Sequence, residues 1–463
     1  MLTTGNYPDI LKVGKVIPVH KTGSKKVLNN YRPITLTSVF SKIIEIILKN
    51  RINNFMEKNL INDKYQYGFT KKSSTLCTTT DLINYVTTNL DHKLRVGAVF
   101  VDLSKAFDIV NHQTLLSKLY KMGIRGNAYR LISSFLNNRK QYVFANNTKS
   151  NPIINKHGVP QGTVLGPLLY SIYVLNLKVA QLNCRYFSFA DDTVLLYTGR
   201  TVVELEHIIN QDLDRYFNWL IQNKLKINLE KTSYMLFRQK NNTDKEMNIC
   251  INEEKIKQVN FIRYLGLIID DTISWKLHVD SIINKIAPMV CAIYKYRNCL
   301  NYKAKLRIYN TYHLSIIRYQ LPLWGICKPI HFKKIESLQN KILKIMFNIN
   351  YLTPTKLVYK ILDVYPIKEV LYLEQYKLAY RVINSLVKCN TAIRYVKNVH
   401  VHNTRNYNNV YLVGVRLEIA LNDPLNRSIQ LYNSLPDGLK RISDFAVFLK
   451  NLESYMKMHN SII

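Results

Sequence analysis

The sequence predicts an α+β protein, and three stretches carry this prediction. Residues 186–197 place short runs of aromatic and β-branched residues on either side of Asp191 and Asp192. Each run is long enough for a strand and too short for an independent helix. Residues 96–103 form an almost continuous apolar run, which is typical of a strand buried at the centre of a sheet. From Trp275 onward the apolar residues recur at helical spacing, so a sheet followed by a stack of helices is expected.

The predicted hairpin carries two adjacent carboxylates at its tip. Because like charges raise each other's pKa and the segment offers no basic partner, a bound cation would relieve the repulsion between Asp191 and Asp192. Mg²⁺ prefers carboxylate oxygens, which makes this turn a candidate metal site. An ordinary polar turn is the alternative, since Asp is common in turns.

A third acid, Asp102, lies near the end of the apolar strand at 96–103. A buried strand seldom carries a carboxylate without a use for it. If this strand pairs with the hairpin, Asp102 and Asp191 would meet and hold two divalent ions. Two metal ions clamped by shared carboxylates align an attacking hydroxyl and neutralise charge on a transferred phosphoryl group.

The charge balance indicates a polyanionic partner. The chain of 463 residues contains 65 Lys and Arg against 31 Asp and Glu, a formal net charge of +34. Nucleic acid is the usual partner of so basic a chain. An anionic membrane surface is the alternative, but no basic amphipathic segment stands out and no apolar run reaches membrane-spanning length. We therefore expect no membrane association.

The cysteines and the N-terminus indicate a reduced, intracellular protein. Seven Cys, an odd number, are scattered without paired spacing, so no disulfide framework is expected. Cys327 and His331 are the nearest approach to a metal-ligand pair, but they lack a second pair, and an ordinary structural role is preferred. No signal-peptide pattern is present at the N-terminus.

Three motifs carry a resemblance to a known family. They are Phe-Val-Asp-Leu-Ser-Lys-Ala-Phe-Asp at 100–108, Gly-Val-Pro-Gln-Gly-Thr-Val-Leu-Gly-Pro-Leu-Leu at 158–169 and Phe-Ala-Asp-Asp at 189–192. In their order and approximate spacing they resemble the central motifs of reverse transcriptases, above all those of non-LTR (LINE-type, jockey-like) retrotransposons.

The resemblance implies a right-hand polymerase fold that performs RNA-directed DNA synthesis. A DNA primer 3′-hydroxyl would attack the α-phosphate of a dNTP on an RNA template. Asp102, Asp191 and Asp192 would be the catalytic acids and the ligands of two Mg²⁺ ions, with Mn²⁺ able to substitute. The same resemblance divides the chain into fingers (1–95), palm (96–272, including insertions into the fingers), helical thumb (273–350) and a mostly helical C-terminal region (351–463).

In the fingers, residues 31–36 lead into an amphipathic helix that ends near Met56. The family analogy makes Arg32 and Lys42 candidates for gripping the incoming triphosphate. Ordinary surface cations on a helix are an equally weighted alternative.

A glycine turn precedes the second fingers helix, which is expected to run to about Leu90. Gly68 lets backbone approach a ligand or another stretch of chain closely. The family implies that Gln66 and Gly68 contact the template, although a simple turn from loop to helix would look the same.

The palm motifs imply a nucleotide pocket. Phe107 lies five residues after Asp102, where the family carries an aromatic ring that closes off the 2′ position of the sugar and so favours deoxynucleotides; a core Phe is the alternative. The resemblance also implies that Gln161 and Gly162 belong to a loop that contacts the dNTP and its template base. Helices are expected at 112–122, 127–136 and about 165–177, with a hairpin at 140–157 that turns at Asn146-Asn147.

The second half of the palm supplies the remaining candidates. A helix is expected at 204–222. The Lys231 that follows it resembles the family's palm motif, which makes it the candidate general acid for the pyrophosphate leaving group; a solvated loop cation is the alternative. A strand is expected at 234–237. Tyr264, Leu265 and Gly266 resemble the motif that positions the primer end.

The thumb and its surroundings are strongly basic, with 21 Lys and Arg against 5 Asp and Glu between residues 276 and 397. These cations are expected to contact the phosphates of a template and primer duplex. The sequence assigns no role to the C-terminal region.

Several alternatives stay open at this point. A catalytically inactive nucleic-acid-binding remnant is one, since the family usually shows Ile-Asn-Asp-Leu where this chain has Val-Leu-Asn-Leu at 174–177. An intron-type or retron-type reverse transcriptase is another, but no maturase-like segment is recognised. No endonuclease domain is expected ahead of residue 31, and the nucleus is implied by the family alone.

Overall fold

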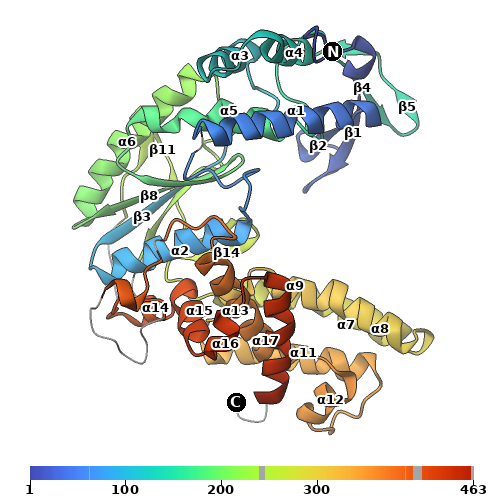
Figure 1. The fold of residues 1–463 in the computed structure, drawn as a ribbon, viewed down its shortest axis with the longest axis vertical. Helices are drawn as coiled ribbons and strands as arrows, with labels where there is room; N and C mark the ends of the chain where they lie inside the picture. Colours follow the sequence, from blue (N-terminus) through green and yellow to red (C-terminus); the bar gives the residue numbers. More distant parts are fainter. Residues whose placement is uncertain (62, 239–245, 392, 400–408, 460–463) are drawn as a thin grey trace.

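A mixed five-stranded sheet lies at the centre of the computed structural model, which describes residues 1–61, 63–238, 246–391, 393–399 and 409–459 (Figure 1). The strand order is β12-β9-β3-β8-β7. The central strand β3 pairs antiparallel with β8 on one side and with β9 on the other. The strands are β3 (Arg95–Val101), β7 (Arg185–Phe189), β8 (Asp192–Gly199), β9 (Ser233–Phe237) and β12 (Lys257–Gln258).

Both faces of this sheet are covered by helices, which explains why the β3 sequence is apolar without alternation. Val99 points into a core shared with α6 (Val202–Gln222). Phe100, on the other face, points into a second core shared with α2 (Thr75–Asp91). The sheet is therefore held rigidly between two packed layers.

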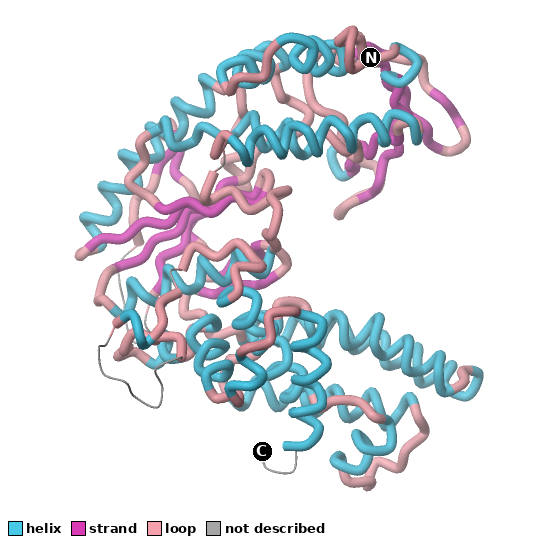
Figure 2. Tube along the Cα trace, viewed as in Figure 1, coloured by secondary structure: helices cyan, strands magenta, loops and turns pink. Residues whose placement is uncertain are grey.

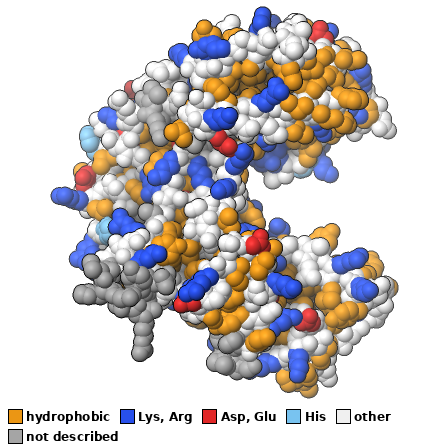
Figure 3. Space-filling view, viewed as in Figure 1, with side chains coloured by type: hydrophobic (Ala, Val, Ile, Leu, Met, Phe, Trp, Pro, Cys, Tyr) orange, Lys and Arg blue, Asp and Glu red, His pale blue; other side chains and the backbone are white. Residues whose placement is uncertain are grey.

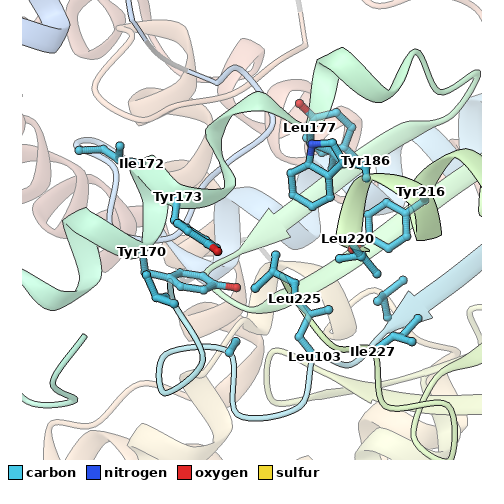
Figure 4. Close-up of a cluster of buried hydrophobic side chains, with 14 of the residues drawn as sticks. Leu103, Tyr170, Ile172, Tyr173, Leu177, Tyr186, Tyr216, Leu220, Leu225 and Ile227 are labelled. Carbon is cyan, nitrogen blue, oxygen red and sulfur yellow. The ribbon is translucent and has the colours of Figure 1, made fainter. Parts of the chain in front are cut away.

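The first core continues to the end of the sheet near Asp102. Figure 4 shows Tyr170 and Tyr173 pointing toward Leu225, with Leu103 and Ile227 close by. The hydroxyl of Tyr173 donates to the backbone carbonyl of Asn223. The end of β3 is therefore held in place by apolar side chains of the first core.

A second sheet forms an N-terminal lobe, which we define as residues 5–58 and 112–154. Its strand order is β2-β1-β4-β5, and β6 also pairs with β4. Ser38 starts α1 by accepting the N–H of Ser41. The elements are β1 (Val13–His20), β2 (Tyr31–Leu36), β4 (Lys140–Ala145), β5 (Thr148–Lys149), β6 (Ile153–Ile154), α1 (Val39–Lys58), α3 (His112–Lys121) and α4 (Gly126–Leu136).

The predicted turn at Asn146-Asn147 is confirmed. The two residues connect β4 to β5, and both have left-handed φ angles, 48° and 59°. Asn tolerates this region better than most residues, which is why the pair is a usable sequence signal. Because β4 pairs with β1, residues 140–154 belong to the N-terminal lobe although they follow β3 in the chain.

The helical half of the molecule follows the sheet. Among its helices, α7 packs on α11, α13 packs on α15, and α14 and α15 return to α2 beside the central sheet (Figures 1 and 2). The helices are α7 (Lys276–Tyr296), α8 (Tyr302–Ile308), α9 (Ser315–Arg318), α10 (Leu321–Trp324), α11 (Pro329–Met346), α12 (Thr355–Leu362), α13 (Ile367–Ile383), α14 (Glu418–Leu421), α15 (Pro424–Asn433), α16 (Asp437–Lys440) and α17 (Phe445–His459).

Shorter elements complete the fold. The predicted helix at about 165–177 is α5 (Gly166–Val174), which continues as a 3₁₀-helix (Leu175–Ala180). A small hairpin follows the central sheet, and another lies nearby: β13 (Phe261–Tyr264) with β14 (Leu267–Asp270), and β10 (Cys250–Ile251) with β11 (Glu254–Lys255). Further 3₁₀ turns are Asp9–Lys12, Leu28–Asn30, Arg297–Cys299 and Val396–Asn398, and a π-helix spans Tyr309–Leu314.

The predicted α+β class is confirmed, with an acid-bearing sheet between two lobes as expected of a right-hand polymerase (Figure 1). Across the described ranges, none of the helices combines the length and the apolar character needed to cross a membrane.

Candidate active site

The tip of the β7-β8 hairpin is a two-residue turn. Phe189 pairs with Asp192, which leaves Ala190 and Asp191 between the strands. Ala190 has a φ of 60°, in the left-handed region. This conformation costs a residue with a Cβ atom roughly 1–2 kcal/mol, so the surrounding structure must hold the turn in place. Asp191 lies in the turn, and Asp192 begins β8.

Strand register brings the third acid to the same place. Val101 pairs with Thr193, so Asp102, the next residue, lies across from Asp192. Directly opposed residues of antiparallel strands have Cα atoms about 4.5–5.5 Å apart. On its other side, the Asp102 carbonyl accepts the N–H of Asn228 at 2.8 Å, and its N–H donates to Thr232 at 3.3 Å. The backbone is therefore held on both sides while the carboxylate stays half-exposed.

Burial and neighbouring acids disfavour the charged forms of the two hairpin acids. Burial raises the pKa of Asp191, and the charge of Asp102 raises it further. Burial, followed by the charges of Asp191 and Asp102, raises the pKa of Asp192 to about 6. Although the Asp192 side chain reaches solvent, protein surrounds it closely enough to disfavour its charge.

This donor set fits divalent cations. Carboxylate oxygens are hard ligands that suit Mg²⁺ and Mn²⁺, and repulsion among the three acids would be relieved by positive charge. Within the described part of the chain, no three His, Cys, Asp or Glu side chains already form a closed ligand cluster. The acids thus supply ligands that an ion would have to draw together.

Two cations of the N-terminal lobe act on the acids from across a hollow. The charges of Arg32 and Lys21 both oppose the rise in pKa of Asp191 and Asp192. Both side chains are exposed, and the space-filling view is hollowed between the N-terminal lobe and the helical half (Figure 3). Lys21 was not among the sequence candidates, although it belongs to the basic run at the start of the chain.

Lys42 is the other predicted triphosphate contact. It is half-buried on α1, and its ammonium forms no hydrogen bond or ion pair with any residue that the structure describes. Arg32 is among the largest influences on the pKa of Asp191 and Asp192, and Lys42 is not.

The loop before α5 is attached to the motif that follows β3. Gln161 donates from Nε2 to Oδ1 of Asp108 at 3.0 Å, which gives Asp108 a positioning role that sequence reasoning did not find. The Gln161 carbonyl accepts the N–H of Thr35 at 2.6 Å. Gly162 has a φ of 100°, and a Cβ there would lie 2.9 Å from the Thr35 carbonyl. Side chain, backbone and glycine together hold this loop against β2.

Phe107 is held by a second aromatic ring. It stacks on Tyr170 of α5 with ring centroids 4.5 Å apart, and Phe69 approaches its edge at 6.4 Å. Phe107 itself is only half-buried. The ring also packs against the first hydrophobic core, so its predicted role at the sugar stays a prediction.

Gly68 packs against the hairpin itself. A Cβ on Gly68 would lie 2.2 Å from the Ala190 nitrogen. The adjacent Tyr67 donates its N–H to the Ser188 carbonyl at 2.8 Å, so residues 65–68 run beside β7. Gln66 accepts the N–H of Ala190 at 3.3 Å and that of Gly68 at 2.9 Å through the same Oε1. The close approach expected of Gly68 is thus made to the strained turn of its own chain.

Lys231 belongs to the turn that holds the Asp102 backbone. Its side chain is exposed, and its ammonium has no hydrogen bond or ion pair to the described residues. Its role as a general acid therefore stays a prediction.

The Tyr264-Leu265-Gly266 turn faces the helical half. Tyr264 is buried, and its hydroxyl donates to the Phe187 carbonyl at 3.4 Å. The Leu265 carbonyl accepts hydrogen bonds from the hydroxyl of Tyr319 at 2.9 Å and from Gln320 at 2.8 Å. Of the three residues only Gly266 is exposed, so a contact with a ligand would fall to it.

Glu45 is a further residue that sequence reasoning missed. Its carboxylate is fully buried on α1 and accepts the N–H groups of Val164 at 2.7 Å and Leu165 at 3.0 Å, beside the Gln161 loop. Ser41 donates to its other oxygen at 2.9 Å. The available signal was an acid on the apolar face of a predicted helix, between Ile44 and Ile46.

Comparison with known families matches residues 19–269 to the description "Reverse transcriptase (RNA-dependent DNA polymerase)". The chain belongs to this reverse transcriptase family. The matched range includes the three acids, the Gln161 loop and the Gly68 turn of this reverse transcriptase, and it ends before the helical half.

Curated relatives of this reverse transcriptase come from non-LTR retrotransposons, which confirms the resemblance read from the motifs. The probable RNA-directed DNA polymerase from transposon BS of Drosophila melanogaster is 27% identical, over 78% of this chain and 41% of that protein. The RNA-directed DNA polymerase from mobile element jockey of the same species is 28% identical, over 74% and 38%. The chain thus spans about two-fifths of the length of these relatives.

Solved structures similar to this reverse transcriptase include telomerases. Apo telomerase of Candida tropicalis, truncated from its C-terminal domain, has a TM-score of 0.40 and 13% identity, over 57% of this chain and 54% of that one. Telomerase of Candida albicans in complex with a fragment of telomeric RNA has a TM-score of 0.40 and 11% identity, over 80% and 66%.

Proposed function

We propose that this reverse transcriptase family member is an active RNA-directed DNA polymerase of a non-LTR retrotransposon. It would transfer a nucleotide from a dNTP to a primer 3′-hydroxyl on an RNA template. The observation that carries the proposal is the meeting of Asp102 with Asp191 and Asp192 at one end of the sheet, with raised pKa values for the two hairpin acids.

Asp102, Asp191 and Asp192 would hold two divalent ions, Mg²⁺ or Mn²⁺. When bound, these ions supply a lowered pKa for the primer hydroxyl and charge neutralisation for the phosphates. The chain's own contribution is the alignment of the carboxylates by strand register, which avoids reorganisation during the reaction.

The nucleotide would lie between the acids and the N-terminal lobe. Arg32 and Lys21 would supply positive charge to the triphosphate, with Lys42 as a further candidate. The loop at Gln161 and Gly162 would bring its backbone close to the base pair. The ring of Phe107 would exclude a 2′-hydroxyl by its bulk. Lys231 would donate a proton to the departing pyrophosphate.

The template and primer would occupy the hollow in front of the sheet. The exposed Gly266 is the candidate primer contact, and the basic helical half would contact the phosphates. Gln66 and Gly68 would act on the template indirectly, because both pack against the hairpin.

Primer extension tests the proposal. Purified protein is given oligo(dT) on poly(A) with dTTP and Mg²⁺ or Mn²⁺, and again with a chelator. We expect extension that requires the ion and is abolished by Asp191→Ala, while the RNA affinity of the variant stays within about twofold, because phosphate contacts supply most of it. Extension by the variant would refute the assignment. RNA binding without extension by the unaltered chain would favour an inactive remnant.

A further inference from the structure

A segment outside the family match runs against the support of the catalytic hairpin. Residues 385–391, which follow α13 and which we call the C-terminal brace, join residues 63–81 by backbone and side-chain hydrogen bonds. The N–H of Lys388 donates to the Lys72 carbonyl at 2.6 Å, and the ammonium of Lys72 donates to the Ser385 carbonyl at 3.0 Å. The N–H of Asn390 donates to Asp81 at 2.9 Å.

The ammonium of Lys388 makes the closest contacts with the stretch that precedes Gly68. It donates to the backbone carbonyl of Gln66 at 2.6 Å and to that of Asp63 at 2.9 Å. It also lies 4.9 Å from the centroid of the Tyr67 ring. Burial lowers the pKa of Lys388 to about 8, so desolvation of this cation is compensated only in part.

The same short stretch contacts the hairpin on its opposite side. Tyr67 and Tyr65 exchange backbone hydrogen bonds with Ser188, at 2.8 and 3.0 Å. Oε1 of Gln66 accepts the N–H of Ala190, the strained residue directly before Asp191. A single residue, Gln66, therefore connects the Lys388 ammonium to the turn that carries a catalytic acid.

A second path runs through Asp81. The Tyr67 hydroxyl donates to Asp81, and the side-chain amide of Asn390 donates to the Tyr67 hydroxyl. Cys389 donates from Sγ to the other oxygen of Asp81 at 3.1 Å. The brace thus holds the backbone carbonyl of Gln66 through Lys388 and the side chain of Tyr67 through Asn390.

We infer that Lys388 is a positioning residue for DNA synthesis: from outside the family match it holds Gln66, and through Gln66 it holds the Ala190-Asp191 turn. The inference rests on the proposed function. It assigns a role to the C-terminal region, for which the sequence offered none. Because the catalytic turn is strained, loss of this restraint should misalign Asp191 without removing any group that binds substrate.

Steady-state kinetics on poly(A) and oligo(dT) test the inference. For Lys388→Met we expect kcat to fall about tenfold, the size of typical coupling through packed networks. The KM for dTTP and the affinity for template and primer should stay within about twofold. Lys388→Arg, which keeps donors to both carbonyls, should restore most of kcat.

Lys397→Met is the matched control, because Lys397 is exposed and, among the residues that the structure describes, its ammonium contacts the ring of Tyr395 alone. It removes the same charge and should leave kcat unchanged. Equal kcat values for Lys388→Met and the unaltered chain, or a loss confined to KM, would overturn the inference. If Lys388→Met does not fold, Lys388→Gln takes its place.

Hydrogen exchange separates this inference from the proposed function. In a chain without polymerase activity, amide exchange of the peptide covering residues 186–192 can still be measured. Lys388→Met should raise that exchange about tenfold at a temperature where both proteins are folded, whereas Lys397→Met should not. Unchanged exchange in Lys388→Met would contradict the role of the brace, whether or not the chain polymerises.

Discussion

The central sheet and the C-terminal brace hold the same hairpin in different ways. The sheet places Asp102 and Asp192 by continuous strand pairing between two apolar cores. The brace reaches the turn through one ammonium and backbone carbonyls, although Lys388 and Gln66 are 322 positions apart in the chain. Packed cores are close to all-or-none, whereas a few polar contacts can be weakened one at a time.

Each region carries a charged group whose pKa is shifted by burial: the pKa of an acid is raised in the sheet, and the pKa of a lysine is lowered in the brace. The pKa of Asp192 rises to about 6 in a place open to solvent and to a ligand. The pKa of Lys388 falls to about 8 although its ammonium is already satisfied by carbonyls of the chain. The Asp192 side chain is thus open to a ligand, as its proposed catalytic role requires, whereas the Lys388 ammonium is already bound by the chain, as its proposed positioning role requires.

The largest expected effect comes from the sheet side. Asp102→Asn keeps the shape of the side chain and removes its charge, so dNTP incorporation should fall about 10³-fold, as when a preorganised electrostatic contact is lost. Primer extension measures the loss, and thermal unfolding should show an intact fold. Asp214→Asn, on the exposed face of α6, is the control and should remain active. Comparable activity of Asp102→Asn and Asp214→Asn would show that the charge placed by the sheet at Asp102 is not needed for incorporation.

The second-largest effect is expected where residues 65–68 contact the hairpin, because this contact links the brace to the sheet. In Gly68→Ala the new Cβ would meet the Ala190 nitrogen at 2.2 Å, and backbone cannot move aside cheaply. We expect a loss of about 1–3 kcal/mol in the free energy of unfolding, as for overpacking. The catalytic turn should also be displaced, so incorporation should fall with it.

Gly438→Ala is the matched control, because a Cβ there meets no atom within 4 Å and the residue lies in α16. Chemical denaturation of both variants gives the comparison. A Gly68→Ala protein as stable and active as Gly438→Ala would show that the turn does not depend on the approach of residues 65–68.

The smallest effect is a pH dependence on the brace side. Burial is the main cause that lowers the pKa of Lys388 to about 8, against a usual value of 10.5, while Asp63, Asp81 and Cys77 oppose the shift. Between these two pH values the unfolded chain binds more protons than the folded one, so this residue's contribution to stability rises with pH. Below pH 8 the contribution stays constant at its lower level.

Urea denaturation of the unaltered chain and of Lys388→Met between pH 7 and pH 10 measures this trend, since the difference between the two isolates the residue. We expect the unaltered chain to gain stability relative to the variant as the pH rises. A difference that is flat, or that falls over this range, would mean that the Lys388 ammonium is not desolvated.

Much of the fold could be predicted because its signals are local. The helices α3, α4 and α6 begin and end within about two residues of the predicted bounds, and α1 and α2 end within about two residues of the predicted ends. The turn at Asn146-Asn147 follows from the tolerance of Asn for left-handed angles. The predicted strand at 96–103 ends at Val101 instead, because Leu103 leaves the sheet to form a bridge with Ile227.

Within the candidate site, the local sequence pattern alone singled out the charged groups, whereas uncharged candidates such as Phe107 and Gln161 came from the family resemblance. An acid in an apolar strand, or a pair of acids at a hairpin tip, is conspicuous within ten residues of sequence. The supports were not visible. The hydrogen bond between Gln161 and Asp108 joins residues 53 positions apart, and the carboxylate of Glu45 caps a loop 119 positions away. Neither contact leaves a periodic pattern.

The sequence by itself determined the chemistry: which residues carry charge, which segments are strands or helices, and which family the chain belongs to. These properties depend on residue type and short-range spacing. Only the tertiary structure decided which carbonyls Lys388 reaches, why residue 68 must be glycine, and how a strained Ala190 is held. Those depend on contacts between distant segments, whose free energy is gained only after the chain has closed the loops between them.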